Sequence, residues 1–403
     1  MSEAENIYVS AVMPCLNEER TIGICVEKAL RCFSMLGIEG EVVVADNGST
    51  DRSVQVAESF GARVVRETRK GYGAALSAGV FAARGQVVVM ADADDTYDWL
   101  TLGDFVEKIE EGYDLVVGNR FLGGIDPGAM PALHRYIGNP VLSGLARLFY
   151  RIPIGDFHCG MRAFTRAAFD QMSPSTPGME FATEMVVSAS QSGLRIGEIP
   201  TRLHPDQRDR PPHLRSFRDG WRHLRFMLTF APDYLFLLPG FVLLILGLSG
   251  MTLLLGGTAS LGSVRFGIHY LALSSMLTLC GANAISFGVL AKVFAARSYP
   301  LLPSSTLKRL LRLFSLERGL LFGLALVVTG LAGDAFILWQ WNMRSGGAME
   351  DTINLAFVCN TLIVLGVNIM FGAFILNMIL GTNPPIESIS EPGGNTTDHI
   401  GLT

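Results

Sequence analysis

The region after residue 233 contains four long apolar stretches, and these constrain the fold more than any other feature. About 20 apolar residues are enough to cross the hydrocarbon core of a bilayer. All four stretches are longer than that, and the only Asp, Glu, Lys or Arg within them is Asp334. The chain is therefore predicted to cross the membrane four times, through Tyr234–Gly257, Ile268–Ala291, Gly319–Met343 and Thr352–Thr382.

Charged residues concentrate in the other part of the chain. Residues 1–233 carry 54 of the 69 charged side chains. This division excludes a uniformly soluble protein, and a hydrophobic content of 49% excludes a largely disordered one. The net charge of −5 lacks the basic excess that is typical of nucleic-acid binding, so we expect no nucleic-acid partner.

The loops between the apolar stretches differ in charge, and this difference predicts the orientation of the chain. Cytoplasmic loops are enriched in Lys and Arg. The loop between the first and second stretches carries only Arg265. The loop between the second and third carries Arg297, Lys308, Arg309, Arg312 and Arg318. We therefore expect a multi-pass membrane protein whose residues 1–233 and both termini are cytoplasmic. The four helices leave surface for a homo-oligomer, which the sequence leaves open.

Asp334 lies inside the third stretch, where a carboxylate is by default a functional candidate. The simpler interpretation is that it lies near the non-cytoplasmic interface, about fifteen residues from the other end of the stretch, at a helical spacing. We favour that interpretation and assign Asp334 no task.

Residues 1–233 alternate between short apolar segments and helical patterns. The expected strands are Val9–Met13, Glu41–Ala45, Arg63–Val65, Val87–Ala91 and Leu115–Val117. The expected helices are Glu18–Leu36, Arg52–Phe60, Gly73–Arg84 and Leu100–Glu111. This alternation predicts an α/β domain with a mostly parallel sheet. Such sheets bind ligands at the carboxyl ends of their strands.

Polar clusters stand at three of the expected strand ends: residues 14–19, 46–51 and 92–95. In the third cluster, Asp92 and Asp94 bring two carboxylates to one turn after an apolar strand. Oxygen ligands of this kind suit Mg²⁺ or Mn²⁺, and such a cation neutralises a diphosphate. An acidic turn alone is a weak signal, but two further polar strand ends strengthen it.

Several motifs in order resemble a known family. They are Pro14-x-x-Asn17-Glu18, Asp46-Asn47-Gly48-Ser49-Thr50-Asp51, Lys70-Gly71-x-Gly73, Asp92-Ala93-Asp94, Gly118-Asn119-Arg120-Phe121 and Asp156-x-x-Cys159-Gly160-x-Arg162. Over about residues 7–230 the chain resembles the family 2 glycosyltransferases, which have the Rossmann-like GT-A fold. Within that family it is most similar to the polyprenyl-phosphate sugar synthases, such as the dolichol-phosphate-glucose and dolichol-phosphate-mannose synthases.

The resemblance implies a role for each matching residue. The nucleoside would be bordered by Pro14, Asn17, Glu18 and Asp46. The metal on the diphosphate would be held by Asp92 and Asp94, and phosphate charge would be met by Arg120 and Arg135. Asn47 stands where the family usually has a second aspartate, which weakens its expected nucleoside contact.

Two of these roles have a purely structural alternative. Asp46 and Asn47 also fit a turn that caps the next helix. Lys70 and Gly71 fit either a close approach to phosphate, which glycine permits, or a plain loop.

Residues 156–184 hold further candidates. Glu180 and Glu184 are spaced to share one face of a helix. They would either touch sugar hydroxyls or belong to a solvated or salt-bridged helix face, and we favour the latter. His158 and Cys159 have no partner pair at metal-ligand spacing, so we interpret them as structural.

A basic segment, residues 206–233, joins the two parts of the chain. It predicts an amphipathic helix in the membrane interface, with Arg215, Arg218, Arg222 and Arg225 on one face and Phe217, Trp221, Leu224 and Leu228 on another. Before that helix, Arg208 and Arg210 either attract anionic lipid or bind the phosphate of a lipid acceptor, and we favour the second role.

Together these features predict an inverting glycosyltransferase that moves a hexose from a nucleotide sugar to polyprenyl or dolichyl phosphate. The run Arg218–Arg222 is similar to one in the dolichol-phosphate-glucose synthases, which favours UDP-glucose over GDP-mannose. The expected parts are a GT-A domain (1–205), the juxtamembrane segment (206–233), a transmembrane domain (234–383) and a disordered tail (384–403). The alternatives are a processive or hydroxyl-directed family 2 enzyme and a non-catalytic membrane scaffold with a degenerate GT-A domain.

Overall fold

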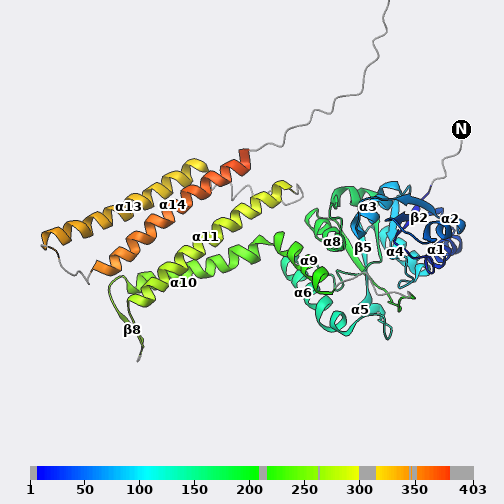
Figure 1. The fold of residues 1–403 in the computed structure, drawn as a ribbon, viewed down its shortest axis with the longest axis horizontal. Coiled ribbons are helices and arrows are strands. Elements are labelled where there is room, and N and C mark those ends of the chain that lie inside the picture. Colours follow the sequence, from blue (N-terminus) through cyan, green and yellow to red (C-terminus); the bar gives the residue numbers. More distant parts are fainter. Residues whose placement is uncertain are drawn as a thin grey trace, which may run out of the picture. The chain divides into compact units, whose positions relative to one another are not determined.

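The computed structural model describes residues 7–207, 216–261, 264–298, 315–344, 346 and 352–381. They form two compact units (Figure 1). The first takes in the described residues of Met1–Leu238 and Ala295–Thr306, and the second those of Pro239–Phe294 and Leu307–Thr403. Arg208, Arg210, Arg215 and the predicted tail lie outside the described residues, and the predicted domain boundaries remain predictions.

The first unit is built on a seven-stranded sheet in the order β3-β2-β1-β4-β6-β5-β7. Its strands are β1 (Val9–Cys15), β2 (Gly40–Asp46), β3 (Arg63–Arg66), β4 (Val87–Met90), β5 (Leu115–Asn119), β6 (Arg162–Thr165) and β7 (Ile196–Pro200). β6 runs antiparallel to both of its neighbours, and the other pairs are parallel. The prediction of an α/β domain with a mostly parallel sheet is confirmed.

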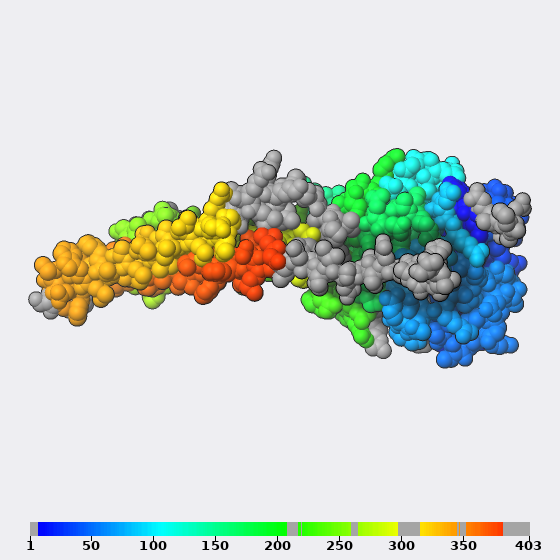
Figure 2. Space-filling model, turned by 90° about the horizontal axis from the view of Figure 1, so that it is seen from above, coloured from blue at the N-terminus to red at the C-terminus, as the bar shows by residue number. Residues whose placement is uncertain are grey.

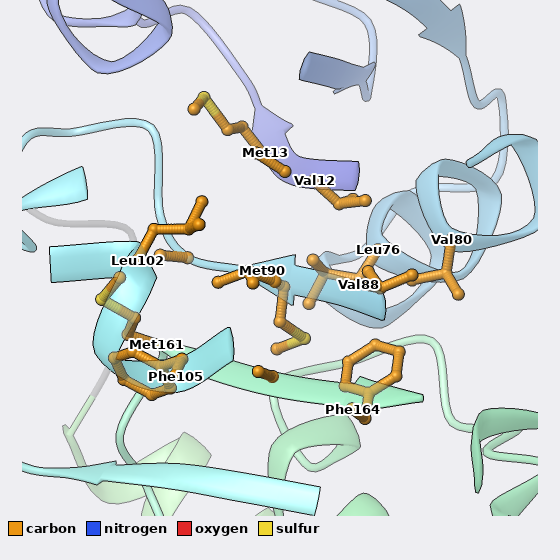
Figure 3. Packing of buried hydrophobic residues seen from close by; sticks show 14 of the residues in the cluster. Val12, Met13, Leu76, Val80, Val88, Met90, Leu102, Phe105, Met161 and Phe164 are labelled. Carbon is orange, nitrogen blue, oxygen red and sulfur yellow. The ribbon is translucent and has the colours of Figure 1, made fainter. Parts of the chain in front are cut away.

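The first unit also contains helices. They are α1 (Ile22–Leu36), α2 (Ser53–Ser59), α3 (Tyr72–Ala82), α4 (Leu102–Glu110), α5 (Arg120–Gly123), α6 (Asn139–Tyr150), α7 (Arg166–Met172), α8 (Phe181–Gln191) and α9 (Ser216–Thr229), with short turns η1 (Trp99–Thr101), η2 (His134–Gly138) and η3 (Asp233–Leu237). Gly79 lets α3 approach the sheet, because a Cβ there would lie 2.5 Å from Val12 Cγ1. Figure 3 shows part of the resulting core, where Leu76 and Val80 of α3 pack in one cluster with residues of α4, β1, β4 and β6.

Two predicted helices begin later than expected. The helix expected from Glu18 begins at Ile22, because the amides of residues 17–19 bond instead to side chains of residues 49–53. The helix expected from Leu100 is the turn η1 followed by α4. β6 and β7 were not predicted at all.

The second unit contains four helices long and apolar enough to cross a membrane, as predicted. They are α10 (Leu238–Leu254), α11 (Ile268–Ser298), α13 (Leu316–Met343) and α14 (Ile353–Gly381). The candidate span that contains α10 begins earlier, at Asp233. The strands β8 (Ala259–Leu261) and β9 (Val264–Phe266) pair as a short hairpin between α10 and α11.

Glycine allows these helices to pack closely. On α14, a Cβ at Gly366 would collide with the Gly323 carbonyl of α13 and lie 2.8 Å from Val327 Cγ2. On α11, a Cβ at Gly281 would meet the backbone of Leu244 in α10. α13 and α14 lie side by side in both views (Figures 1 and 2). Close approach through small residues is the usual way in which helices associate in a membrane.

This packing predicts the cost of adding a side chain between α13 and α14. Gly366→Leu should destabilise the protein by about 1–3 kcal/mol, because the added atoms have no space. The measurement is the thermal unfolding midpoint of the full chain in detergent micelles. Gly372→Ala is the control, since a Cβ there meets no atom within 4 Å. Equal midpoints for the two variants would contradict the packing described here.

Candidate active site

The three polar clusters of the sequence lie at neighbouring strand ends. β2, β1 and β4 are adjacent and parallel, so residues 14–19, 46–51 and 92–95 follow strands that end at the same edge of the sheet. The chain runs from β1 to β2 and β3 on one side, and then places β4 on the other side of β1. Ligands of open α/β sheets bind at such a reversal of strand order.

The first two clusters are joined by hydrogen bonds. Asn17 has a left-handed backbone (φ 59°), and its Oδ1 accepts from the Thr50 amide at 2.7 Å. The Asp46 carboxylate accepts from the amides of Gly48 (3.2 Å) and Ser49 (3.0 Å). Pro14 lies in β1, and Glu18 is buried with its amide donating to Ser53 Oγ. The turn predicted at Asp46 is present, and the nucleoside roles of these residues remain predictions.

Asn47 connects this edge to the Lys70–Gly73 loop. Its Nδ2 donates to the carbonyls of Glu67 (3.0 Å) and Arg69 (2.8 Å), and its Oδ1 accepts from the Gly71 amide (2.9 Å). Lys70 Nζ donates to the Asn47 carbonyl at 2.8 Å. Gly71 has φ 140°, and a Cβ there would collide with the Pro177 carbonyl. The segment is therefore a tightly specified loop, in which Asn47 orders the backbone that follows.

The Asp92–Asp94 turn is fixed by its neighbours. Asp94 Oδ1 accepts from the amide (3.1 Å) and hydroxyl (2.6 Å) of Thr96. Burial, together with the charge of Asp92, raises the pKa of Tyr72 well above its usual value. Thr96 lies outside the motifs of the sequence analysis, and its contact with Asp94 was not predicted.

Strand β6 brings a fourth segment to this edge, and it does so because it is antiparallel. Its first residue, Arg162, pairs with Met90 at the end of β4, so the preceding Gly160 lies beside Asp92. A Cβ at Gly160 would lie 2.8 Å from Asp92 Oδ2, and the Gly160 amide donates to the Tyr97 hydroxyl at 2.9 Å. The motif Cys159-Gly160-x-Arg162 was visible in the sequence, but the direction of its strand was not.

Arg120 and Asp156 form a buried ion pair. Arg120 Nε lies 2.7 Å from Asp156 Oδ2, and Nη2 lies 2.8 Å from Oδ1. Burial alone would lower the pKa of Arg120, but Tyr97 and Asp156 outweigh it and raise that pKa well above the usual value. Asp156 thus binds two of the three guanidinium nitrogens, Nε and Nη2. The phosphate contact of Arg120 remains a prediction, and Nη1 is the nitrogen expected to make it. Arg135 lies on η2, with its guanidinium 5.6 Å from the Tyr136 ring centroid.

Glu180 and Glu184 have separate environments, and the expected solvated helix face is wrong. Glu184 is 1% exposed, and its carboxylate accepts four hydrogen bonds from the amides and hydroxyls of Ser175 and Thr176. It holds the loop before α8 and is not positioned for a sugar. Glu180 Oε2 is buried and has no hydrogen-bond partner among the described residues.

Cys159 is buried, and both ring nitrogens of His158 are buried without a hydrogen-bond partner among the described residues, so the structural interpretation of these two residues remains a prediction. The His158 ring packs edge-on against His223, with 4.6 Å between centroids, and burial lowers the pKa of His158 well below its usual value. Burial also raises the pKa of Cys159 to about 12, so it stays a thiol. In the ranges that the structure covers, no group of three or more His, Cys, Asp or Glu side chains forms a metal site.

The ion pair predicts a measurable loss of stability. Asp156→Asn should destabilise the protein by about 3–5 kcal/mol, because the Arg120 charge stays buried without its carboxylate. Adding Arg120→Met to that variant should recover part of the loss, since the unpaired charge is then removed. Thermal unfolding midpoints of both variants test this, and a double variant less stable than Asp156→Asn would show that the pair is not the cause.

Comparisons with known proteins agree with this architecture. Residues 10–173 match the model of glycosyl transferase family 2, and residues 289–380 match that of the glycosyltransferase family 2 C-terminal transmembrane region. The low-salt glycan biosynthesis hexosyltransferase Agl6 of Haloferax volcanii is 38% identical over 376 residues, which cover 92% of this chain and 89% of Agl6.

Two further proteins match a smaller share of the chain. The dolichyl-phosphate hexose transferase of Haloferax volcanii is 34% identical over 192 residues, 48% of this chain and 81% of that protein. The crystal structure of glucosyl-3-phosphoglycerate synthase from Mycobacterium tuberculosis superposes with a TM-score of 0.44 and 23% identity, covering 65% of this chain and 87% of that one. With Agl6 matched over nearly its whole length, this chain belongs to glycosyltransferase family 2 and is a membrane-bound glycosyltransferase.

Proposed function

We propose that this enzyme transfers a hexose from a nucleotide sugar to a polyprenyl phosphate, on the cytoplasmic face of the membrane. UDP-glucose is the favoured donor and GDP-mannose the next. The observation that carries the proposal is the convergence of Asp92 and Asp94 with the Asn17 and Asp46 loops at one sheet edge, in a chain with four membrane-spanning helices. The names of two relatives, a hexosyltransferase and a dolichyl-phosphate hexose transferase, support it.

The donor set fits a hard divalent cation. Asp92 and Asp94 offer carboxylate oxygens on one short turn, and a diphosphate supplies the remaining oxygens that Mg²⁺ or Mn²⁺ prefers. When bound there, such a cation neutralises the charge that grows on the leaving diphosphate. The amide and hydroxyl of Thr96 hold the Asp94 carboxylate in place before the donor arrives.

The acceptor phosphate needs orientation more than deprotonation. A phosphate monoester already carries between one and two negative charges at neutral pH, with a second pKa of about 6. Attack of its oxygen on C1 of the hexose forms the new C1–O bond while the bond to the nucleoside diphosphate breaks, which inverts the anomeric carbon. Arg120, Arg135, Arg208 and Arg210 are proposed to orient the phosphates. Glu180 is proposed to accept a hydrogen bond from a hexose hydroxyl, since its buried Oε2 lacks a described partner.

One side of the first unit suits contact with a membrane. On η2 and α6, Tyr136 is 70% exposed, and Ile137, Val141 and Leu148 are also exposed. α6 packs on α9, where Phe217 (85%) and Trp221 (57%) are exposed while His223 and Met227 face inward. Large exposed apolar patches on a protein surface mark interaction sites. Since Arg218 and Arg225 are exposed on α9 as well, we propose that this side lies in the headgroup region.

The transfer itself can be tested with the purified full chain. In the presence of undecaprenyl phosphate and Mg²⁺ or Mn²⁺, nucleoside diphosphate should be released from one donor of a panel of nucleotide sugars. Asp94→Asn should reduce the rate by at least about a hundredfold, which corresponds to about 2.7 kcal/mol of lost transition-state stabilisation. Chelation with EDTA should abolish release.

Asp104→Asn is the matched control, because Asp104 lies in the first turn of α4, away from the strand ends, and should retain wild-type turnover. Release that does not depend on the lipid, or no release with any donor, would contradict the proposed acceptor.

Trp221 reports on the membrane contact. In a Trp339→Phe/Trp341→Phe background, lipids brominated near the headgroup should quench Trp221 fluorescence but not that of Trp99, which is fully buried. Adding Trp221→Phe identifies the quenched fraction. Unquenched Trp221 would place α9 in water and contradict the proposed contact.

A further inference from the structure

The segment that follows β7, residues 201–207, is attached to the loop after α5. The Leu203 amide donates to the Gly124 carbonyl at 3.0 Å, and the Leu203 carbonyl accepts from the Asp126 amide at 3.0 Å. α5 is the short helix that begins with Arg120, one of the residues proposed to orient a phosphate. The segment is therefore fixed to the part of the candidate site that carries this arginine.

The same segment also contacts the turn that carries Asp94. The His204 amide donates to the Thr96 carbonyl at 2.9 Å. The Thr96 amide and hydroxyl in turn donate to Asp94 Oδ1, at 3.1 and 2.6 Å. Three residues farther along the segment, Gln207 Nε2 donates to Asp95 Oδ2 at 3.4 Å. A displacement of the segment would thus reach the Asp94 carboxylate through a single residue, Thr96.

One carboxylate, that of Asp126, binds the segment through two side chains. Asp126 Oδ1 accepts from Nε (2.9 Å) and Nη2 (2.8 Å) of Arg202, and Oδ2 lies 2.8 Å from Nδ1 of His204. The hydrogen bonds from Arg202, and to a smaller extent the one from His204, hold the pKa of Asp126 below its usual value. The carboxylate is therefore ionised at neutral pH, and His204 Nδ1 donates to it. Both carboxylate oxygens thus bind the residues on either side of Leu203.

The turn needs such contacts because its backbone is strained at Asp95. Asp95 has φ 60°, a left-handed conformation that is unfavourable for a residue with a Cβ. Strained conformations of this kind persist where the surrounding structure holds them. Lys28 of α1 binds Asp95 Oδ1 at 2.7 Å, and Gln207 binds Oδ2. α1 and the 201–207 segment therefore both hold the turn.

We propose that Asp126 is a positioning residue for the transfer. By binding the 201–207 segment, it keeps that segment against Thr96, and Thr96 orients the Asp94 carboxylate toward the cation. The inference rests on the proposed function, because the cation at Asp94 is part of that proposal. Groups that orient a metal ligand typically change the metal affinity about 10- to 100-fold when they are removed. Since Asp126 acts through Thr96, we expect the lower end of that range.

The first test measures the metal affinity of the full chain in detergent micelles. Mn²⁺ is titrated in the presence of UDP or GDP, and the free ion is measured by its electron paramagnetic resonance signal. Asp126→Ala should raise the Kd for Mn²⁺ about tenfold. Asp126→Asn should retain most of the affinity, because its amide oxygen still accepts from Arg202. In the transfer assay, Asp126→Ala should raise the Mn²⁺ concentration needed for half-maximal rate and leave kcat at saturating Mn²⁺ close to that of the wild type.

Glu41→Ala is the matched control. The Glu41 carboxylate also accepts from an arginine, with Arg63 Nη2 at 2.7 Å, but Glu41 lies near the beginning of β2, at the opposite end of that strand from Asp46. This variant should leave the Kd for Mn²⁺ unchanged. The double variant Asp126→Ala/Thr96→Val tests the route between the two residues. If Asp126 acts through Thr96, the double variant should lose less affinity than the product of the two single losses. Losses that multiply would show independent action and overturn the proposed route.

Hydrogen exchange separates this inference from the proposed function. In the chain without metal, Asp126→Ala should speed deuterium exchange of the amides of residues 94–97 relative to Glu41→Ala, because the turn has lost contacts. If the wild type binds no Mn²⁺ with either nucleotide, the proposed cation site fails, and the exchange rates decide whether Asp126 orders the turn. Equal exchange in the two variants overturns the role of Asp126. An unchanged Kd for Mn²⁺ in Asp126→Ala, when the wild type binds the ion, overturns it as well.

Discussion

The site depends on one buried arginine. Arg162 is fully buried, and its guanidinium donates to the carbonyls of Phe157 (2.8 Å), Cys159 (2.9 Å) and Ala182. These bonds attach the segment before β6 to the start of α8. That segment carries Asp156, which holds Arg120, and Gly160, which lies beside Asp92. A buried cation bound to carbonyl dipoles therefore positions groups from three different elements around one strand end.

In both units, glycine allows segments of the chain to approach each other closely. In the first unit, Gly71 and Gly160 leave room for the Pro177 carbonyl and the Asp92 carboxylate, so loops from distant parts of the chain meet without side chains between them. In the second, Gly323 and Gly366 bring α13 and α14 together.

The sequence predicted the parts of the site that depend on local pattern. Strand ends are marked by apolar runs that stop at polar clusters, so the convergence of Asp46 and Asp92 followed from the alternation of strands and helices. Contacts set by tertiary packing were missed. Arg120 pairs with the carboxylate of Asp156, 36 residues away in the sequence, and the residues around Arg120 give no pattern that predicts this pair. Glu180 and Glu184 share a helix spacing, yet Glu184 is buried because the Ser175–Thr176 loop folds onto it. The antiparallel direction of β6 is likewise a property of the whole sheet.

In the proposed reaction the hexose ends on a polyprenyl phosphate with inverted configuration at C1. The most direct measurement is the NMR spectrum of the lipid product, made by the full chain from an α-linked nucleotide hexose and undecaprenyl phosphate. The expected product is a hexose joined to the lipid through one phosphate, with a β-anomeric proton. An α-anomer, a diphosphate linkage, or a sugar joined to anything other than the lipid phosphate would contradict it.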